Sequence, residues 1–131
     1  MKAPAFAYAK PASLEEALAL LGRPNAKILA GGQSLIPSLN MRLSSPDLLV
    51  DITGIRDLHG ISSNNGILRL GALTTHSQIE KSPEVRTHVS LLAEAAPHIA
   101  HPAIRNRGTI GGSLALADPA AEFPEIGRAH V

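Results

Sequence analysis

Residues 27–52 read KILAGGQSLIPSLNMRLSSPDLLVDI and carry the clearest secondary-structure signal in the chain. A short apolar run ends at Gly31-Gly32, a segment with helical spacing follows, and a second apolar run covers 48–52. Short apolar runs bounded by turn residues are typical of buried strands. Pro37 limits the regularity of the helix expected over 33–39, because proline cannot donate a backbone hydrogen bond. The stretch therefore predicts strand, helix and strand.

A further helix and strand are expected upstream of this stretch. Ser13 and Glu16 form a capping-box pattern, in which each side chain can accept from the other residue's free N–H. Apolar residues then recur at helical spacing over 14–21. Phe6 and Tyr8, two positions apart, are suited to a short strand before that helix. The resulting order β–α–β–α–β favours a small parallel sheet.

The pattern changes near His59. Residues 61–71 predict a hairpin around Asn65-Gly66, since both residue types tolerate the positive φ of its turn. Helices are expected over 75–81 and 84–96. A change from α/β pattern to hairpin indicates two subdomains and places the chain in the α+β class.

Composition narrows the class of protein. Of the 131 residues 44% are hydrophobic and 18% charged, which is enough for a packed core. A formal net charge of +1 without a basic stripe argues against a nucleic-acid partner. The chain contains no cysteine, so it can hold neither a disulfide nor an iron–sulfur cluster through thiolates. No apolar run reaches membrane-spanning length. We expect a cytoplasmic globular protein.

Two glycine-rich segments carry the functional signal. AGGQSL at 30–35 lies between a predicted strand and helix, where glycine lets the backbone approach a ligand and helix-start N–H groups bind phosphate. RNRGTIGGS at 105–113 offers a second nest of N–H donors, flanked by hydroxyls. Two such loops suggest a ligand with two adjacent phosphates. The alternative is that the two segments are unrelated turns. Arg105 and Arg107 either balance phosphate charge or are solvated.

Other chemistries find little support in the sequence. Ser34 and Ser113 have no evident His–Asp partners, so a hydrolase is not indicated. His98 and His101 are three positions apart but have no third ligand, so no metal site is expected. His76 either faces a cofactor or has a helix-start or packing role. We predict no catalytic acid, base or nucleophile.

Four motifs match those of one family. AGGQS at 30–34 and HPAIRNRGTIGGS at 101–113 fit its two double-glycine motifs, and GALTTH at 71–76 and DPAAE at 118–122 fit as well. On these motifs the chain resembles the flavin-binding medium subunit of the molybdenum hydroxylases, as in carbon monoxide dehydrogenase and xanthine dehydrogenase-type enzymes. The likeness runs from Phe6 to about Pro124.

The resemblance implies an FAD-binding PCMH-type domain. A small βαβ subdomain over 1–56 would be followed by a mixed or antiparallel subdomain over 57–124, with FAD bound between them. Two loops would wrap the pyrophosphate, one residue would supply a backbone contact, and two carboxylates would accept from ribose or adenine-side hydroxyls. The expected residues of the first loop are Ile28, Leu29, Ala30, Gly31, Gly32, Gln33, Ser34 and Leu35. Those of the second loop are Thr109, Ile110, Gly111, Gly112 and Ser113. Ala100 would supply the backbone contact, and Asp118 and Glu122 are the two carboxylates.

The resemblance also implies a function, that of an FAD-dependent oxidoreductase subunit. Electrons would pass from iron–sulfur clusters on a partner through FAD to an acceptor. The expected partners are a large subunit with the molybdenum cofactor and a small [2Fe-2S] subunit, which agrees with the absence of cysteine. The flavin carries the redox chemistry, so the protein binds and tunes it. The alternatives are a stand-alone flavin oxidase or reductase of the same cofactor fold, and a truncated fragment that binds no flavin.

The end of the chain departs from the family pattern. Family members continue well beyond Pro124, whereas residues 125–131, EIGRAHV, read like a translated sequencing adapter. We therefore expect a second subdomain that is incomplete at its C-terminus and a non-native tail. Missing strands would leave an unpaired sheet edge and uncovered apolar surface. We expect the isolated fragment to be inactive.

Overall fold

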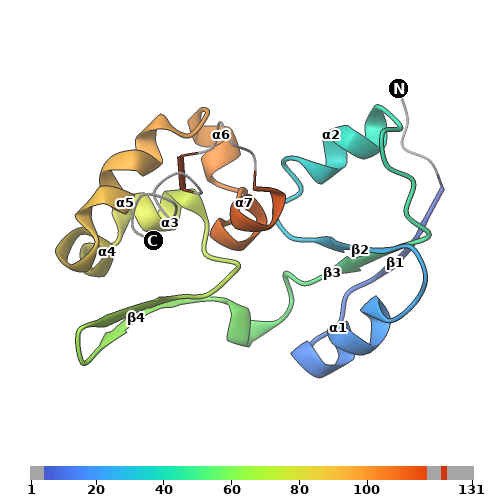
Figure 1. Cartoon of the computed structure of the whole chain (residues 1–131), viewed down its shortest axis with the longest axis horizontal. Helices are drawn as coiled ribbons and strands as arrows, with labels where there is room; N and C mark the ends of the chain where they lie inside the picture. Colours follow the sequence, from blue (N-terminus) through green and yellow to red (C-terminus); the bar gives the residue numbers. More distant parts are fainter. Residues whose placement is uncertain (1–4, 118–121, 124–131) are drawn as a thin grey trace. The chain divides into compact units, whose positions relative to one another are not determined.

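A computed structural model describes residues 5–117 and 122–123 of the chain. The chain divides into two compact units, Met1–Asp57 and Leu58–Val131, which are described one at a time (Figure 1). The division expected from the sequence falls after residue 56. The expected tail, 125–131, lies outside the described residues.

The first unit is built on a three-stranded parallel sheet. Its strands are β1 (Ala7–Ala9), β2 (Ala26–Leu29) and β3 (Leu48–Asp51). The order is β1-β3-β2, and both pairings are parallel, so that Val50 lies opposite Ala9 and Ile28. All four residues of β3 are buried, as a continuous apolar run requires in the centre of a parallel sheet. The predicted parallel sheet is confirmed.

Helices α1 (Leu14–Leu21) and α2 (Leu35–Asn40) connect these strands. The Ser13 hydroxyl accepts from the Glu16 N–H at 3.1 Å, as the capping box predicts. The Glu16 carboxylate accepts from the N–H of Ala12 at 3.2 Å, so the expected reciprocal bond to Ser13 is replaced by a bond one residue earlier. Helix α2 begins two residues later than predicted, and Pro37 occupies its first turn, where few N–H groups have helical partners.

A buried carboxylate ends the central strand. Asp51 is 8% exposed and accepts hydrogen bonds from the Tyr8 hydroxyl and from both the N–H and the hydroxyl of Thr53, at 2.9 and 2.6 Å. Burial raises the pKa of Asp51, but the bonds from Thr53 and Tyr8 and the charge of Lys10 outweigh it and lower the pKa below its usual value. The bond from Tyr8 joins strand β1 to the end of strand β3.

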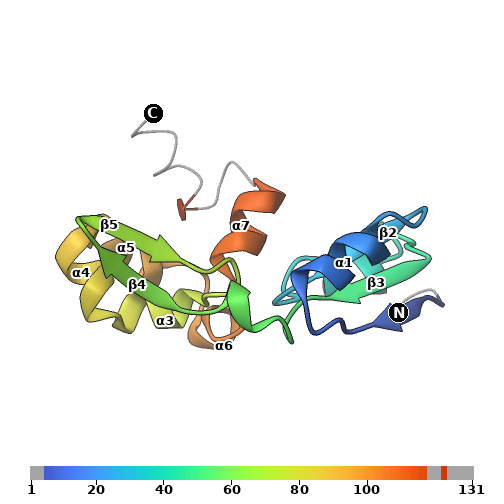
Figure 2. The ribbon, with the colours of Figure 1, turned by 90° about the horizontal axis from the view of Figure 1, so that it is seen from below.

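The second unit opens with the predicted hairpin. Strands β4 (Ile61–Asn64) and β5 (Ile67–Leu70) pair antiparallel, and Figure 2 shows them side by side. The two turn residues, Asn65 and Gly66, have φ of 52° and 77°. Two successive positive φ angles are the signature of the hairpin turn that Asn-Gly favours. With the parallel sheet of the first unit, this hairpin confirms the α+β class.

Short helices fill the rest of the second unit. They are α3 (His76–Lys81), α4 (Pro83–His88), α5 (Ser90–Ala95), a 3₁₀ turn (Ala96–His98), α6 (Pro102–Arg105) and α7 (Ile110–Leu116). Their shared core contains Ile79, Val85, Ala95, Ala96 and Phe123. In the described part of the chain, no helix combines the length and apolar character that crossing a membrane requires.

The single helix expected over 84–96 is wrong. The chain leaves the helical conformation at Val89, where φ is −141° and ψ is 68°, and resumes it in α5. Val85 and Ala95, on either side of this break, are both buried in the same core cluster.

Candidate cofactor site

The first glycine segment forms a tight turn between β2 and α2. Gly32 has φ of 77°, in the left-handed region that residues with a Cβ rarely adopt. A Cβ on Gly32 would also lie 3.0 Å from Cγ1 of Ile36. Both observations explain why a glycine occupies this position. The turn lets the backbone reverse directly from the strand into the helix.

This turn presents backbone donors. Helix α2 begins with bonds from the Ile36 N–H to the Gly32 carbonyl at 3.0 Å and from the Ser38 N–H to the Ser34 carbonyl at 3.2 Å. Within the described part of the chain, no hydrogen bond uses the N–H groups of Gln33, Ser34 and Leu35. Unpaired N–H groups at the start of a helix favour an anion such as phosphate. The structure therefore keeps the predicted donors available.

The second glycine segment is not a loop of free donors. Gly111 and Gly112 lie in the first turn of α7, whose N-cap is Thr109. Four successive N–H groups already have acceptors. Ile110 donates to the Thr74 carbonyl at 2.9 Å, Gly111 to the Ala72 carbonyl at 2.9 Å, Gly112 to the Thr109 hydroxyl at 3.1 Å and Ser113 to the Thr109 carbonyl at 3.0 Å. The second nest of donors expected from the sequence is therefore wrong.

Gly111 has a packing role in this unit. A Cβ on Gly111 would lie 2.7 Å from the Ala72 carbonyl oxygen and 2.8 Å from the Ala72 Cβ. The start of α7 thus approaches the segment before α3 as closely as two backbones allow. This explains the glycine without a ligand. The Ser113 side chain is partly exposed at this segment, whereas Thr109 is 6% exposed and its hydroxyl caps α7.

The remaining expected residues have different surroundings. Ile28 and Leu29 end strand β2, and Ala30 leads into the first turn. Ala100 has φ of 45°, a left-handed conformation that is uncommon for alanine. Glu122 is exposed, and Asp118 lies outside the described residues.

Arg105 is neither solvated nor free to balance phosphate charge. Its side chain is 12% exposed and pairs with Glu80, with 3.5 Å between Nε and Oε2. The two N–H groups of Nη1 are shared among three backbone carbonyls in the preceding turn, those of Pro97, Ile99 and Ala100. Sequence reasoning missed this role, because the contacts need the turn at 97–100. Arg107 is exposed.

His76 belongs to the core. It is 5% exposed, and its ring meets the Phe123 ring edge-on with centroids 5.1 Å apart. A Cβ on Gly108 would lie 2.9 Å from Cδ2 of the imidazole, so glycine there makes room for the ring. Burial lowers the pKa of His76, which favours the neutral form. His76 is also the first residue of α3, so the structure shows the helix-start and packing role.

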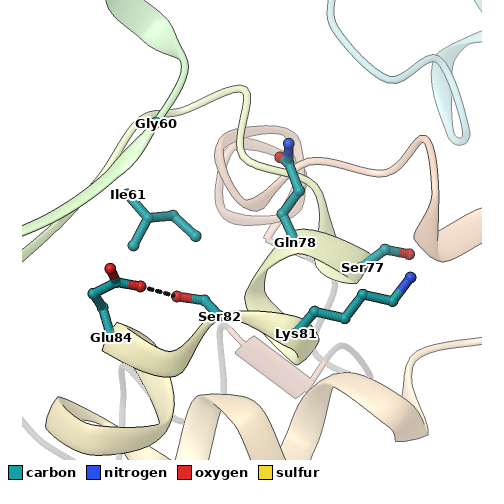
Figure 3. Close-up of a pocket in the computed structure, with 7 residues that line it drawn as sticks. All are labelled: Gly60, Ile61, Ser77, Gln78, Lys81, Ser82 and Glu84. Carbon is teal, nitrogen blue, oxygen red and sulfur yellow. Dashed lines mark hydrogen bonds between the residues drawn. The ribbon is translucent and has the colours of Figure 1, made fainter.

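A separate hollow of about 420 Å³ lies in the second unit (Figure 3). Its lining residues are Gly60, Ile61, Ser77, Gln78, Lys81, Ser82 and Glu84. Gln78 completes a capping box with Thr75, and the Ser82 hydroxyl donates to Glu84 at 3.1 Å and caps α4. These polar groups hold the starts of α3 and α4. Among the residues that the structure describes, none of the expected cofactor-binding residues lines this hollow.

The fold and the first turn define a class, an α+β protein whose turn between strand and helix presents unengaged backbone N–H groups. Within that class, the chain belongs to the family described as the FAD binding domain in molybdopterin dehydrogenase, which matches residues 4–129. The resemblance seen in the four sequence motifs is thereby confirmed, and FAD is the cofactor.

Relatives of known function support the same family. The 6-hydroxypseudooxynicotine dehydrogenase complex subunit alpha of Paenarthrobacter nicotinovorans is 52% identical over 128 residues, covering 96% of this chain and 43% of that protein. The carbon monoxide dehydrogenase medium chain of Hydrogenophaga pseudoflava is 44% identical over 125 residues, which cover 94% of this chain and 44% of that protein. The crystal structure of quinoline 2-oxidoreductase from Pseudomonas putida 86 superposes with a TM-score of 0.94 at 49% identity. The superposition covers 96% of this chain and 45% of that chain. The chain spans less than half the length of these relatives.

Proposed function

We propose that this chain is the FAD-binding part of an electron-transfer subunit in a molybdenum-dependent hydroxylase or dehydrogenase. Electrons would reach the subunit from iron–sulfur clusters on a partner and leave it for an acceptor. The proposed partners are a large molybdenum-cofactor subunit and a small [2Fe-2S] subunit, in the cytoplasm. The family match and the names of the similar dehydrogenase subunits support this proposal.

The main structural support for this proposal is the turn at Gly32. The unengaged N–H groups of Gln33, Ser34 and Leu35 suit the pyrophosphate of FAD, because several donors at a helix start can share one anionic group. The left-handed Gly32 brings the backbone to this position without a side chain in the way. We propose that these donors bind the pyrophosphate.

The second segment contributes in another way. The N–H groups of residues 110–113 are engaged within the unit, so we propose that the hydroxyls of Thr109 and Ser113 contact the cofactor. Contacts from Ala100, and from Asp118 and Glu122 to ribose or adenine-side hydroxyls, complete the proposed site. When bound, FAD supplies the redox chemistry, and the chain binds and orients it. We expect no turnover from the isolated chain, because its electron donor lies on another subunit.

Titration of the chain with FAD tests this proposal, with flavin fluorescence and protein melting followed together. Saturable binding with a raised melting temperature is expected, because a ligand that binds only the folded state stabilises it. Gly32→Ala should weaken FAD binding. Gly66→Ala is the matched control, since Gly66 has the same φ of 77° but lies in the hairpin turn.

The two glycine variants separate strain from binding. Both should lower the melting temperature, because alanine is strained at positive φ. Only Gly32→Ala should reduce the affinity for FAD when both variants are fully folded. Equal FAD affinity in the two variants, or a parent chain that binds no FAD, would refute the proposed site.

A further inference from the structure

Arg105 organises the turn that precedes α6. Nη1 lies 3.1 Å from the carbonyl oxygens of Pro97 and Ile99 and 3.2 Å from that of Ala100. The nearby Glu80 carboxylate partly balances the buried charge. A guanidinium presents its donors in a rigid plane, so it can fix several carbonyls at once. Arg105 thereby holds the turn over 97–100 in one conformation.

The direction of the held carbonyls sets the direction of two N–H groups. In a trans peptide the carbonyl and the following N–H point in opposite directions. Because the carbonyls of Ile99 and Ala100 point at Arg105, the N–H groups of Ala100 and His101 point away from it. Within the described residues, neither of these N–H groups takes part in a hydrogen bond. The left-handed φ of Ala100 is maintained by the same contacts.

We propose that Arg105 is a positioning residue of the FAD site, which turns the N–H groups of Ala100 and His101 outward as donors to the cofactor. This inference rests on the proposed function, since it assumes that FAD binds next to Ala100. In this proposal Arg105 acts through the turn rather than by contact with FAD, since Nη1 is engaged by three carbonyls and Nε lies 3.5 Å from the Glu80 carboxylate.

The test uses the whole chain and three variants, with FAD as the probe. Arg105→Met removes the donors, and Arg105→Lys keeps the charge without the planar fork. Arg86→Met is the matched control, because Arg86 is exposed on α4. We expect Arg105→Met to weaken FAD binding by about tenfold, as for the loss of hydrogen bonds from a charged group. Arg105→Lys should weaken binding by less, and Arg86→Met should leave it unchanged.

A second measurement follows the two N–H groups directly. In amide NMR spectra of the parent chain, FAD should shift the Ala100 and His101 resonances and slow their hydrogen exchange. In Arg105→Met, at a temperature where the variant is folded, FAD should no longer shift these two resonances or slow their exchange. If Arg105→Met does not fold, the same measurement is made on Arg105→Lys.

The outcomes separate this inference from the proposed function. A parent chain that binds no FAD refutes both. A parent that binds FAD without any change at Ala100 and His101 refutes the inference alone. Equal FAD affinity in Arg105→Met and Arg86→Met also refutes the inference alone, even if the melting temperature of Arg105→Met falls, because that fall would show only a structural role.

Discussion

Thr75 and Thr109 lie opposite each other in an antiparallel bridge, and each is the N-cap of the helix that follows it. The bridge is flanked by bonds from the His76 N–H to the Gly108 carbonyl at 3.0 Å and from the Ile110 N–H to the Thr74 carbonyl at 2.9 Å. The starts of α3 and α7 are therefore fixed to each other. A change at either cap acts on both helices.

Removing the Thr109 hydroxyl should destabilise the second unit. Thr109→Ala leaves the Gly112 N–H without its acceptor, and we expect a loss of about 1 kcal/mol in the free energy of unfolding, typical of a lost cap. Thr109→Ser is the control, because it keeps the hydroxyl and loses the methyl group. Urea denaturation measures both. If Thr109→Ser loses as much unfolding free energy as Thr109→Ala, the effect comes from the methyl group and not from the hydroxyl.

The two neighbouring glycines should differ in their tolerance of a methyl group. In Gly111→Ala the Cβ meets the backbone oxygen of Ala72 at 2.7 Å, and we expect a loss of about 3 kcal/mol, since backbone must shift. In Gly112→Ala the Cβ meets the Thr109 hydroxyl at 2.9 Å, and a side chain can rotate away. The smaller loss is therefore expected for Gly112→Ala. Thermal unfolding of the two variants compares them, and the reverse ranking would contradict the packing described for Gly111.

Stability should fall as the pH drops below about 6.5, the usual pKa of histidine. Burial lowers the pKa of His76 in the folded chain, so the unfolded chain takes up the proton first and is favoured. His76→Gln should reduce this pH dependence. His88→Gln is the control, because His88 is exposed. Melting temperatures from pH 7.5 down to pH 5, roughly the range in which histidine titrates, measure the effect, and identical profiles for both variants would contradict it.

A second acid dependence is expected from Asp51. Its folded pKa lies below the usual 3.8, so its contribution is present above that pH and is lost as the pH falls through the folded pKa. Asp51→Asn should therefore lower stability at neutral pH and weaken the acid dependence below pH 3.8. Asp47→Asn, at an exposed position, is the control. Denaturant unfolding across the acid range checks both variants, and the expectation fails if they behave alike.

The first unit could be predicted from sequence because its signals are local. Apolar runs bounded by turn residues fix β2 and β3, and the strand–Gly-Gly–helix pattern places the donors of residues 33–35. The start of α7 could not be predicted in this way. Glycine is a poor helix former, and the acceptors for Ile110 and Gly111 are Thr74 and Ala72, far away in the sequence. Spacing within residues 105–113 carries no information on those partners, so their N–H groups were expected to be free.

The same distinction explains the break at Val89 and the role of Arg105. Periodicity predicts that a segment is helical, but it does not show where the helix is interrupted. The Arg105 contacts depend on the turn at 97–100, whose left-handed Ala100 has no signal in the sequence, because alanine rarely adopts that conformation.

The position of β3 between β1 and β2 has a consequence for the order in which the first unit assembles during synthesis. Ala7 and Ala26 both pair with Leu48, and the two outer strands do not pair with each other. Strands β1 and β2 therefore leave the ribosome without a sheet partner, and their pairing awaits residues 48–51. The hairpin β4–β5 needs only its own turn to close. Because distant pairings are slower to form than local ones, the nascent sheet depends on its last strand, and the turn at Gly32 takes its final place only when that strand arrives.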